Sequence, residues 1–165
     1  WTILQSTWLS QNFSEHFLHE PVLEGVIALP AGDVAEPFVD AEDVADVAVA
    51  ALTDDRHIGQ VYELTGPRLL TFADAAHDIA EATGRDIGYV SVTAEEYKAA
   101  ALAAGVPEEE VEPLTDLFTT VLDGRNARLA NGVQQALGRE PRDFRDYARA
   151  AAASGVWNIA QEAER

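Results

Sequence analysis

The sequence predicts an α/β fold built on a parallel sheet, and three observations carry this prediction. Short segments rich in β-branched and aromatic residues, bounded by Gly, Pro or Asp, alternate with helical segments along the chain. The helical segments place apolar residues on one face. With 165 residues, of which 47% are hydrophobic, the chain is long enough to bury one core. Strands that alternate with helices pair in parallel through helical crossovers, so a doubly wound sheet is expected.

Four segments are predicted strands. They are residues 1–4, 26–29, 60–65 and 87–92. Parallel sheets are covered on both faces and need crossover connections, so four short strands make an incomplete doubly wound sheet. The first segment, WTIL, has no strand before it, and its pairing partner is therefore expected upstream of Trp1. The absence of Met from the whole chain agrees with a chain cut from a longer one.

Three predicted helices begin at a capping residue. The capping residues are Asp40, Thr71 and Thr93, followed at the third helical position by Asp43, Asp74 and Glu96. The second and third of these helices end at Gly84 and Gly105. The apolar face of the first helix consists of Val44, Val47, Ala48, Ala51 and Leu52.

Three further helices are predicted toward the C-terminus. The first has an apolar face formed by Val111, Leu114, Leu117, Phe118 and Val121. The second lies between Asn131 and Gly138. The third helix is expected to turn four residues toward the core: Phe144, Tyr147, Ala148 and Ala151. Trp157 is expected to dock the last helix onto the body. Residues 1–157 should thus form one unit, followed by a polar tail over 158–165.

The chain is strongly acidic, with 29 Asp and Glu against 11 Lys and Arg and a net charge of −18. Such a chain repels a phosphate backbone, so no nucleic-acid partner is expected. The absence of Cys excludes disulfides, thiolate metal sites and thiol catalysis. No apolar run is long enough to cross a membrane and no signal-peptide pattern opens the chain, so we expect a cytoplasmic protein without a membrane partner.

Five segments carry a family resemblance. They are WTILQSTWLSQNF, PFVDAEDVADVAVAAL, YELTGPRLLTFADAAHDIAEATGRDIGYVSV, EEYKAAALAAGVPEE and LGREPRDFRDYARAAAASGVW. In the same order, they resemble the NmrA-like family of atypical short-chain dehydrogenases/reductases, which includes NAD(P)H-dependent quinone and azo-type reductases and redox-sensing regulators. The first segment is similar to the family pattern W-T-I-L-R-P-x-x-F-x-x-N-F.

The resemblance implies that the chain is the C-terminal half of a Rossmann-like, NAD(P)-binding fold, with a helix-rich substrate-side subdomain. In this family a Gly-rich turn holds the pyrophosphate of NADP or NAD, and no three Gly residues of this chain have that spacing after a strand. The Tyr-x-x-x-Lys pair of typical short-chain dehydrogenases is absent as well. Tyr97 and Lys98 are adjacent, so on a helix their side chains point about 100° apart.

The resemblance also implies where the cofactor lies. Doubly wound folds bind ligands at the carboxyl ends of their strands, and the turn after the first predicted strand is such a place. Gln5, Ser6, Thr7 and Trp8 are therefore expected against the nicotinamide of NADP or NAD, with plain packing as the alternative. The family usually has Arg-Pro where this chain has Gln5-Ser6, so a cation and a rigid turn are lost.

Substrate-binding residues are expected on the helix that follows this turn. Asn12 and Phe13 would wall the substrate pocket and line a concave surface together with Thr7 and Trp8. Phe118 belongs to an apolar helix that would cover the pocket. Core packing is the alternative for each of these aromatic side chains.

No metal site is predicted. His16 and His19 lie three residues apart, but no third ligand converges on them. The carboxylates of residues 40–46 resemble an acid–base or Mg²⁺ cluster, although capping and the helix dipole account for Asp40 and Asp43. The LTGPR segment has one Gly and a Pro that removes a backbone donor, so it is interpreted as a strand-to-helix turn.

Three functions remain open. The first is the substrate-binding half of an NAD(P)H-dependent reductase that acts on a quinone-like or other small conjugated acceptor, where the cofactor supplies the hydride chemistry. The second is a non-catalytic NAD(P)-sensing regulator, and the third is an interaction domain or inactive truncated fragment. Residues 1–165 alone are expected to bind NAD(P)H poorly and to self-associate through an exposed sheet edge at WTIL and QVYELT.

Overall fold

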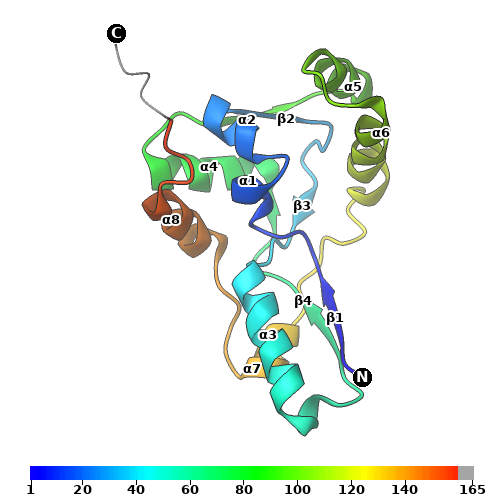
Figure 1. Ribbon diagram of the computed structural model, residues 1–165, viewed down its shortest axis with the longest axis vertical. Coiled ribbons are helices and arrows are strands. Elements are labelled where there is room, and N and C mark those ends of the chain that lie inside the picture. The colour runs from blue at the N-terminus through cyan, green and yellow to red at the C-terminus, as the bar shows by residue number, and fades with distance from the viewer. Residues whose placement is uncertain (160–165) are drawn as a thin grey trace.

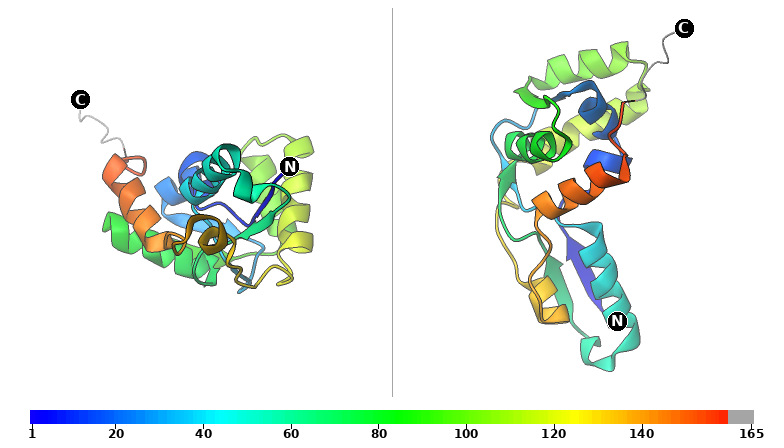
Figure 2. Two further views of the ribbon diagram at one scale, coloured as in Figure 1. Left: turned by 90° about the horizontal axis from the view of Figure 1, so that it is seen from below. Right: turned by 90° about the vertical axis from the view of Figure 1, so that its left-hand side faces the viewer.

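The computed structural model describes residues 1–159, and it has two lobes (Figure 1). The small lobe contains the N-terminus and consists of β1 (Ile3–Ser6), β4 (Val61–Leu64), α3 (Ala41–Thr53), α7 (Gly132–Leu137) and the 3₁₀ turn η1 (Asp55–His57). The large lobe holds the remaining elements. The right-hand view of Figure 2 shows the same elongated arrangement from the side, and the left-hand view looks at the molecule from below.

The large lobe is mostly helical. Its helices are α1 (Asn12–Glu15), α2 (His19–Glu24), α4 (Phe72–Thr83), α5 (Ala94–Ala103), α6 (Glu108–Asp116), which continues into the π-helical turn η2 (Leu117–Val121), and α8 (Phe144–Ser154). Helix α4 packs against α8, and α5 packs against α6. This lobe contains the helix-rich subdomain that the sequence predicted.

The strands form three separate pairs in the described residues. β1 and β4 are parallel, with Ile3 opposite Val61 and Ser6 opposite Leu64. β2 (Val26–Leu29) and β6 (Gly88–Ser91) are also parallel, whereas β3 (Ala35–Glu36) and β5 (Leu70–Thr71) pair antiparallel. The four predicted strands are present and pair in parallel, but the first covers Ile3–Ser6 instead of residues 1–4, and the strands form two separate pairs. The sequence did not predict that β1 finds a partner within the chain, nor the two-residue strands β3 and β5.

Side-chain capping defines the helix starts that the sequence predicted. Thr71 and Thr93 each accept a hydrogen bond from the backbone at the third helical position and form a complete capping box. Asp40 caps α3 through the backbone N–H of Glu42. Asp43 has a different role from the capping predicted for it. It is fully buried and accepts hydrogen bonds from the backbone and side chain of Arg142.

The core of the large lobe is built on aromatic side chains. Phe13 lies within 5.5 Å of Phe38 and 5.4 Å of Phe144, measured between ring centroids. The Trp157 indole N–H donates a 2.9 Å hydrogen bond to the carbonyl of Phe13, so the expected docking of Trp157 is confirmed. Residues 160–165, most of the predicted tail, lie outside the described part of the chain.

The small lobe has a core of its own between α3, α7 and the β1–β4 pair. It consists of Val39, Val47, Tyr62, Leu64, Val133 and Ala136. Leu52 was predicted on the inward face of α3, and this was wrong, because the side chain is 85% exposed. It lies in the last turn of α3, which projects past α7 at the end of the lobe (Figure 1).

Two glycines allow stretches of backbone to pass each other closely, and one of these contacts lies inside the small lobe. A Cβ on Gly66 would lie 2.0 Å from the carbonyl oxygen of Phe38, and a Cβ on Gly132 would lie 2.3 Å from that of Glu63. Neither position accepts a side chain without a shift of the backbone. The LTGPR segment is thus a turn that carries the chain from β4 toward β5 and α4, as its sequence predicted.

None of the helices within residues 1–159 is long and apolar enough to cross a membrane.

Candidate functional site

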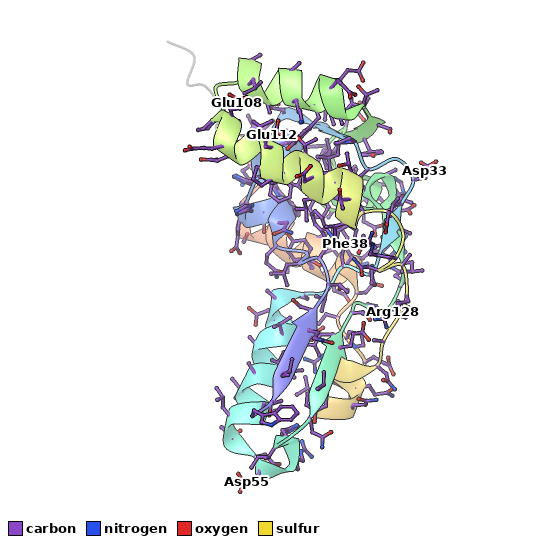
Figure 3. All side chains as sticks on the ribbon, turned by 90° about the vertical axis from the view of Figure 1, so that its right-hand side faces the viewer. Asp33, Phe38, Asp55, Glu108, Glu112 and Arg128 are labelled. Carbon is purple, nitrogen blue, oxygen red and sulfur yellow. The ribbon has the colours of Figure 1, made fainter. Side chains whose placement is uncertain are left out.

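A cavity of about 540 Å³ lies at the carboxyl ends of β1 and β4. Figure 3 shows both strands pointing from the small lobe toward the η2 end of the α6 segment, with Phe38 labelled between the lobes. The cavity is lined by Gln5, Ser6, Thr7, Trp8, Leu9, Asn12, Phe17, Glu36, Glu63, Leu117, Val121 and Asn126. Its size is in the range of small-molecule sites, and its position is where doubly wound folds place their ligands.

The chain after β1 is held to the cavity wall by hydrogen bonds to main-chain carbonyl groups. The backbone N–H of Thr7 donates to the carbonyl of Leu64, and the Thr7 hydroxyl donates to that of Pro37 at 2.8 Å. The Trp8 carbonyl accepts from the N–H of Val39 at 2.9 Å. The segment 7–10 therefore runs beside the segment 36–39. This pairing fixes the backbone at the end of the strand, from which the side chains of Thr7 and Trp8 project.

Trp8 forms a half-buried aromatic wall of this cavity. Its ring packs edge-on against Phe17 and Phe72, with centroid distances of 6.2 and 5.8 Å, and stacks on Phe118 at 5.9 Å. Pairs of this kind hold a ring in place beyond the area that they bury. Trp8 thus has a rigid backing, and it lines the cavity together with Asn12. The roles of these residues toward a cofactor or a substrate stay predictions.

Two predicted pocket residues lie elsewhere. Phe13 is 0% exposed in the core and Phe118 is 1% exposed behind Trp8, so neither lines the cavity. Phe13 follows Asn12 on α1, and neighbouring helical residues point about 100° apart, so the polar residue faces the cavity and the aromatic one the core. The η2 turn contributes Leu117 and Val121 instead. Their separation of four residues places both on the same side of a helical turn.

Glu36 is a cavity residue that the sequence did not reveal. Its side chain is 0% exposed, and neither of its carboxyl oxygens has a hydrogen-bond partner within the described residues. Burial alone raises the pKa of Glu36 to about 7. The two-residue strand β3 is too short to show an alternating pattern, so nothing in the sequence indicates that position 36 points inward.

The second acid at this cavity is in a different state. Glu63, on β4, is partly exposed and forms an ion pair with Arg128. Arg128 is labelled beside β4 in Figure 3. The other described lining residues are uncharged. Glu36 therefore has no counter-charge in the cavity.

These residues fit one end of a nicotinamide dinucleotide better than the other. The aromatic wall and the amides of Gln5, Asn12 and Asn126 suit a nicotinamide ring, which is flat and carries a carboxamide. A pyrophosphate needs cations or a row of free backbone N–H groups. Arg128, the cation paired at this cavity, is engaged with Glu63. The described residues therefore fit the nicotinamide end and do not fit the pyrophosphate.

A larger cavity, of about 740 Å³, lies beside α4 and α8, away from the strand ends. Its two arginines are already engaged, since Arg85 donates to the carbonyls of Leu23 and Trp157 and Arg149 pairs with Asp146. Its lining includes Ile159, the last residue that the structure describes. Among the described residues that line it, no buried side-chain atom lacks a hydrogen-bond partner, in contrast to the cavity at the strand ends.

No group of three His, Asp or Glu residues among those described could hold a metal ion. His19 lies 3.0 Å from the carbonyl of Val156, and the ring of His16 packs edge-on against Phe17. The acidic residues of α3 do not form a metal cluster either. Asp43 and Asp46 share Arg139 and Arg142.

Comparison with known proteins finds no matching family model but clear relatives. The chain is 33% identical over 155 residues to the NAD(P)H azoreductase of Xenophilus azovorans, a match that covers 93% of this chain and 54% of the relative. The Citrobacter sp. triphenylmethane reductase complexed with NADP(H) is similar at a TM-score of 0.76 and 23% identity, over 88% of this chain and 51% of that one. NmrA, a negative transcriptional regulator in complex with NAD, is similar at a TM-score of 0.60 and 18% identity, over 96% and 56%. The chain thus spans about half the length of the relatives that it matches.

The similarity to these structures defines a Rossmann-like α/β fold and confirms the predicted fold class. Within that class, the resemblance to the NmrA-like proteins is confirmed, and the share of each relative that is covered agrees with their C-terminal half.

Proposed function

We propose that this chain forms the acceptor side of an NAD(P)H-dependent reductase of quinone-like or other small conjugated molecules. One observation carries the proposal: the cavity at the carboxyl ends of β1 and β4 has a rigidly backed indole, Trp8, as its wall. A flat conjugated acceptor can stack on such a ring while polar groups around it fix the orientation.

In this proposal Gln5, Ser6, Thr7 and Trp8 would hold the nicotinamide of NADP or NAD beside the acceptor. The azoreductase and the triphenylmethane reductase are NAD(P)H-linked proteins by name, and this supports a nicotinamide cofactor here. The bound cofactor supplies the hydride, while the chain holds the acceptor face to face with it and excludes water. The pyrophosphate would be held by residues other than those described here.

The alternative is a dinucleotide-sensing regulator without turnover. The similarity to NmrA favours it, because that structure extends over 96% of this chain and its protein is a transcriptional regulator in complex with NAD. The reductase and the sensor would both bind the nicotinamide at the cavity at the strand ends, so only a measurement of turnover distinguishes them.

The test measures NADH and NADPH oxidation with a panel of quinones, azo dyes and triphenylmethane dyes. It uses residues 1–165 and, in parallel, the product of the longest reading frame that encodes them. Sustained oxidation with at least one acceptor supports the reductase. Cofactor binding without turnover across the panel would favour the sensor.

Two tryptophan variants make the test specific to the cavity. Trp8→Ala should lower kcat/KM for the acceptor by about tenfold, because it removes the stacking surface. Trp1→Ala is the matched control, since Trp1 lies at the opposite end of the same strand segment and is 73% exposed. Equal losses in both variants would contradict the proposed acceptor site.

A further inference from the structure

We propose that Glu36 is the proton donor of the acceptor site, where its carboxyl group hydrogen-bonds a carbonyl oxygen or imine-type nitrogen of the conjugated acceptor and then protonates it. This inference rests on the proposed function and names the residue of this chain that would complete the reduction.

The position of Glu36 is fixed by the backbone on both sides. β3 pairs with β5, with Glu36 opposite Leu70. The next residue, Pro37, accepts the hydrogen bond from the Thr7 hydroxyl at 2.8 Å. The side chain thus belongs to the wall of the same cavity as Thr7 and Trp8.

The absence of partners around this carboxyl group is unusual within the chain. The other three buried carboxylates of the described residues, those of Asp40, Asp43 and Asp78, all accept hydrogen bonds from named donors. Both oxygens of Glu36 have none. An ionised carboxylate in that position would bear the full cost of desolvation, so the group holds its proton near neutral pH.

A protonated carboxyl group is both a donor and an acceptor, and here neither capacity is used within the described residues. The one other ionisable side chain that these residues bring to the cavity is Glu63, which is paired with Arg128. No cation therefore competes for the Glu36 carboxyl group. A ligand bound in the cavity would supply the hydrogen-bond partner that the Glu36 carboxyl group lacks.

The chemistry of the proposed function needs such a proton. A quinone that accepts a hydride, one proton with two electrons, from reduced nicotinamide becomes a hydroquinone monoanion. The O–H bond of Glu36 then breaks, its proton forms the second O–H bond of the hydroquinone, and the glutamate is left as a carboxylate. A proton from solvent restores the acid after the product leaves. A group with a pKa near 7 suits this role, because it is protonated in a large fraction of molecules and is still a competent acid.

The experiment separates this inference from the proposed function because it needs no turnover. Menadione, a naphthoquinone, is titrated into residues 1–165 at pH 6 and pH 8, and binding is followed by the quenching of Trp8 fluorescence, with Trp8→Phe as the blank. The wild-type chain should bind menadione about tenfold more tightly at pH 6, where Glu36 can donate the hydrogen bond. Glu36→Gln should bind it equally at both pH values, because its amide keeps a donor that does not titrate.

Glu63→Gln is the matched control, since it removes the other carboxylate of the same cavity and should leave the pH dependence intact. A carbon-13 NMR titration of glutamate-labelled protein, compared with Glu36→Gln, should show one carboxyl group that titrates near pH 7. In the product of the longest reading frame, Glu36→Gln should lower kcat for quinone while KM for NAD(P)H stays unchanged. If no acceptor is turned over, the reductase is rejected. The menadione binding and the NMR titration still test whether Glu36 donates a hydrogen bond to the ligand.

Three results would overturn the inference. They are menadione binding that is absent or equal at both pH values in the wild type, a Glu36→Gln variant that keeps the wild-type pH dependence, and a Glu36 resonance that titrates near its ordinary value.

Discussion

Two buried acids in this molecule, Asp43 in the small lobe and Glu36 at the cavity, are equally inaccessible and are treated in opposite ways. Asp43 is 0% exposed and is bound by the guanidinium groups of Arg139 at 2.7 Å and Arg142 at 2.5 Å, with the backbone N–H of Arg142 on its second oxygen. Glu36 is also 0% exposed and has no partner on either oxygen. One acid is neutralised by the fold and the other is left to hold its own proton.

The difference separates a structural acid from a functional candidate. The ion pairs of Asp43 connect α3 to the segment that follows α7, and they tie the small lobe to the chain that leads into α8. Burying a carboxyl group without partners makes no such connection and costs stability at neutral pH. An unsatisfied buried group of this kind calls for an explanation outside packing, and the cavity beside Glu36 supplies one.

The largest effect is expected from removing the partnered acid. Asp43→Ala leaves two arginines and a backbone N–H without their acceptor and should lower the free energy of unfolding by about 4 kcal/mol. Urea unfolding followed by circular dichroism measures the loss. A loss below about 1 kcal/mol would mean that the two guanidinium groups are satisfied by water, and the contrast between the two acids would disappear.

Removing the unpartnered acid should have the opposite sign. The pKa of Glu36 is about 7 in the folded chain against 4.5 as its ordinary value, so the unfolded chain loses this proton first as the pH rises. Folding stability therefore falls between these two values and stays low above pH 7. Glu36→Gln should raise the free energy of unfolding by about 3 kcal/mol at pH 8 and by less than about 1 kcal/mol at pH 5. Urea unfolding at the two pH values checks this, and destabilisation at pH 8 would contradict it.

A third variant tests whether a buried acid with arginine partners also stabilises the large lobe. The Asp78 side chain is 2% exposed and accepts from Arg68 at 2.5 Å and from Arg145 at 2.9 Å. Asp78→Asn keeps the shape but removes the charge, so a loss of about 2 kcal/mol is expected. Thermal unfolding measures it, with the exposed Asp146→Asn as control. An unchanged midpoint would show that burial with arginine partners does not by itself mark a stabilising acid.

The smallest effect is expected at Glu63, which lies at the same cavity as Glu36 but is partly exposed and paired with Arg128. Glu63→Gln should change the free energy of unfolding by less than about 1 kcal/mol at any pH between 5 and 8. Urea unfolding across that range is the measurement. A pH-dependent gain like that of Glu36→Gln would assign the unusual titration to the cavity as a whole and not to one residue.

The sequence was sufficient to predict the features that depend only on residues close together in the chain. The capping boxes at Thr71 and Thr93 and the strand over Val26–Leu29 need only neighbours in the chain, and the structure has them as predicted. What the sequence could not show depends on partners far along the chain. Leu52 has the right spacing for burial, but the helix outruns the element that would cover it.

The same limit applies to the cavity. Trp8 and Asn12 could be placed there because the turn after a first strand has a known location in this kind of fold. Phe118 and Leu117 are adjacent on one apolar turn, and only the packing of Phe118 behind Trp8 decides which of them meets the cavity. Glu36 could not be predicted from the sequence for the same reason, because residues distant in the chain bury its carboxyl group and leave it without a hydrogen-bond partner.

The close backbone contacts at Gly66 and Gly132 have a consequence for how this cavity can change. Gly66 touches the carbonyl of Phe38, two residues from Glu36, and Gly132 touches that of Glu63. Both contacts join main chain to main chain, so the frame of the cavity does not depend on the side chains that fill it. A randomised library at Leu117, Val121 and Asn126 could therefore explore new acceptors on an unchanged frame, whereas selection for folded protein should return glycine at 66 and 132.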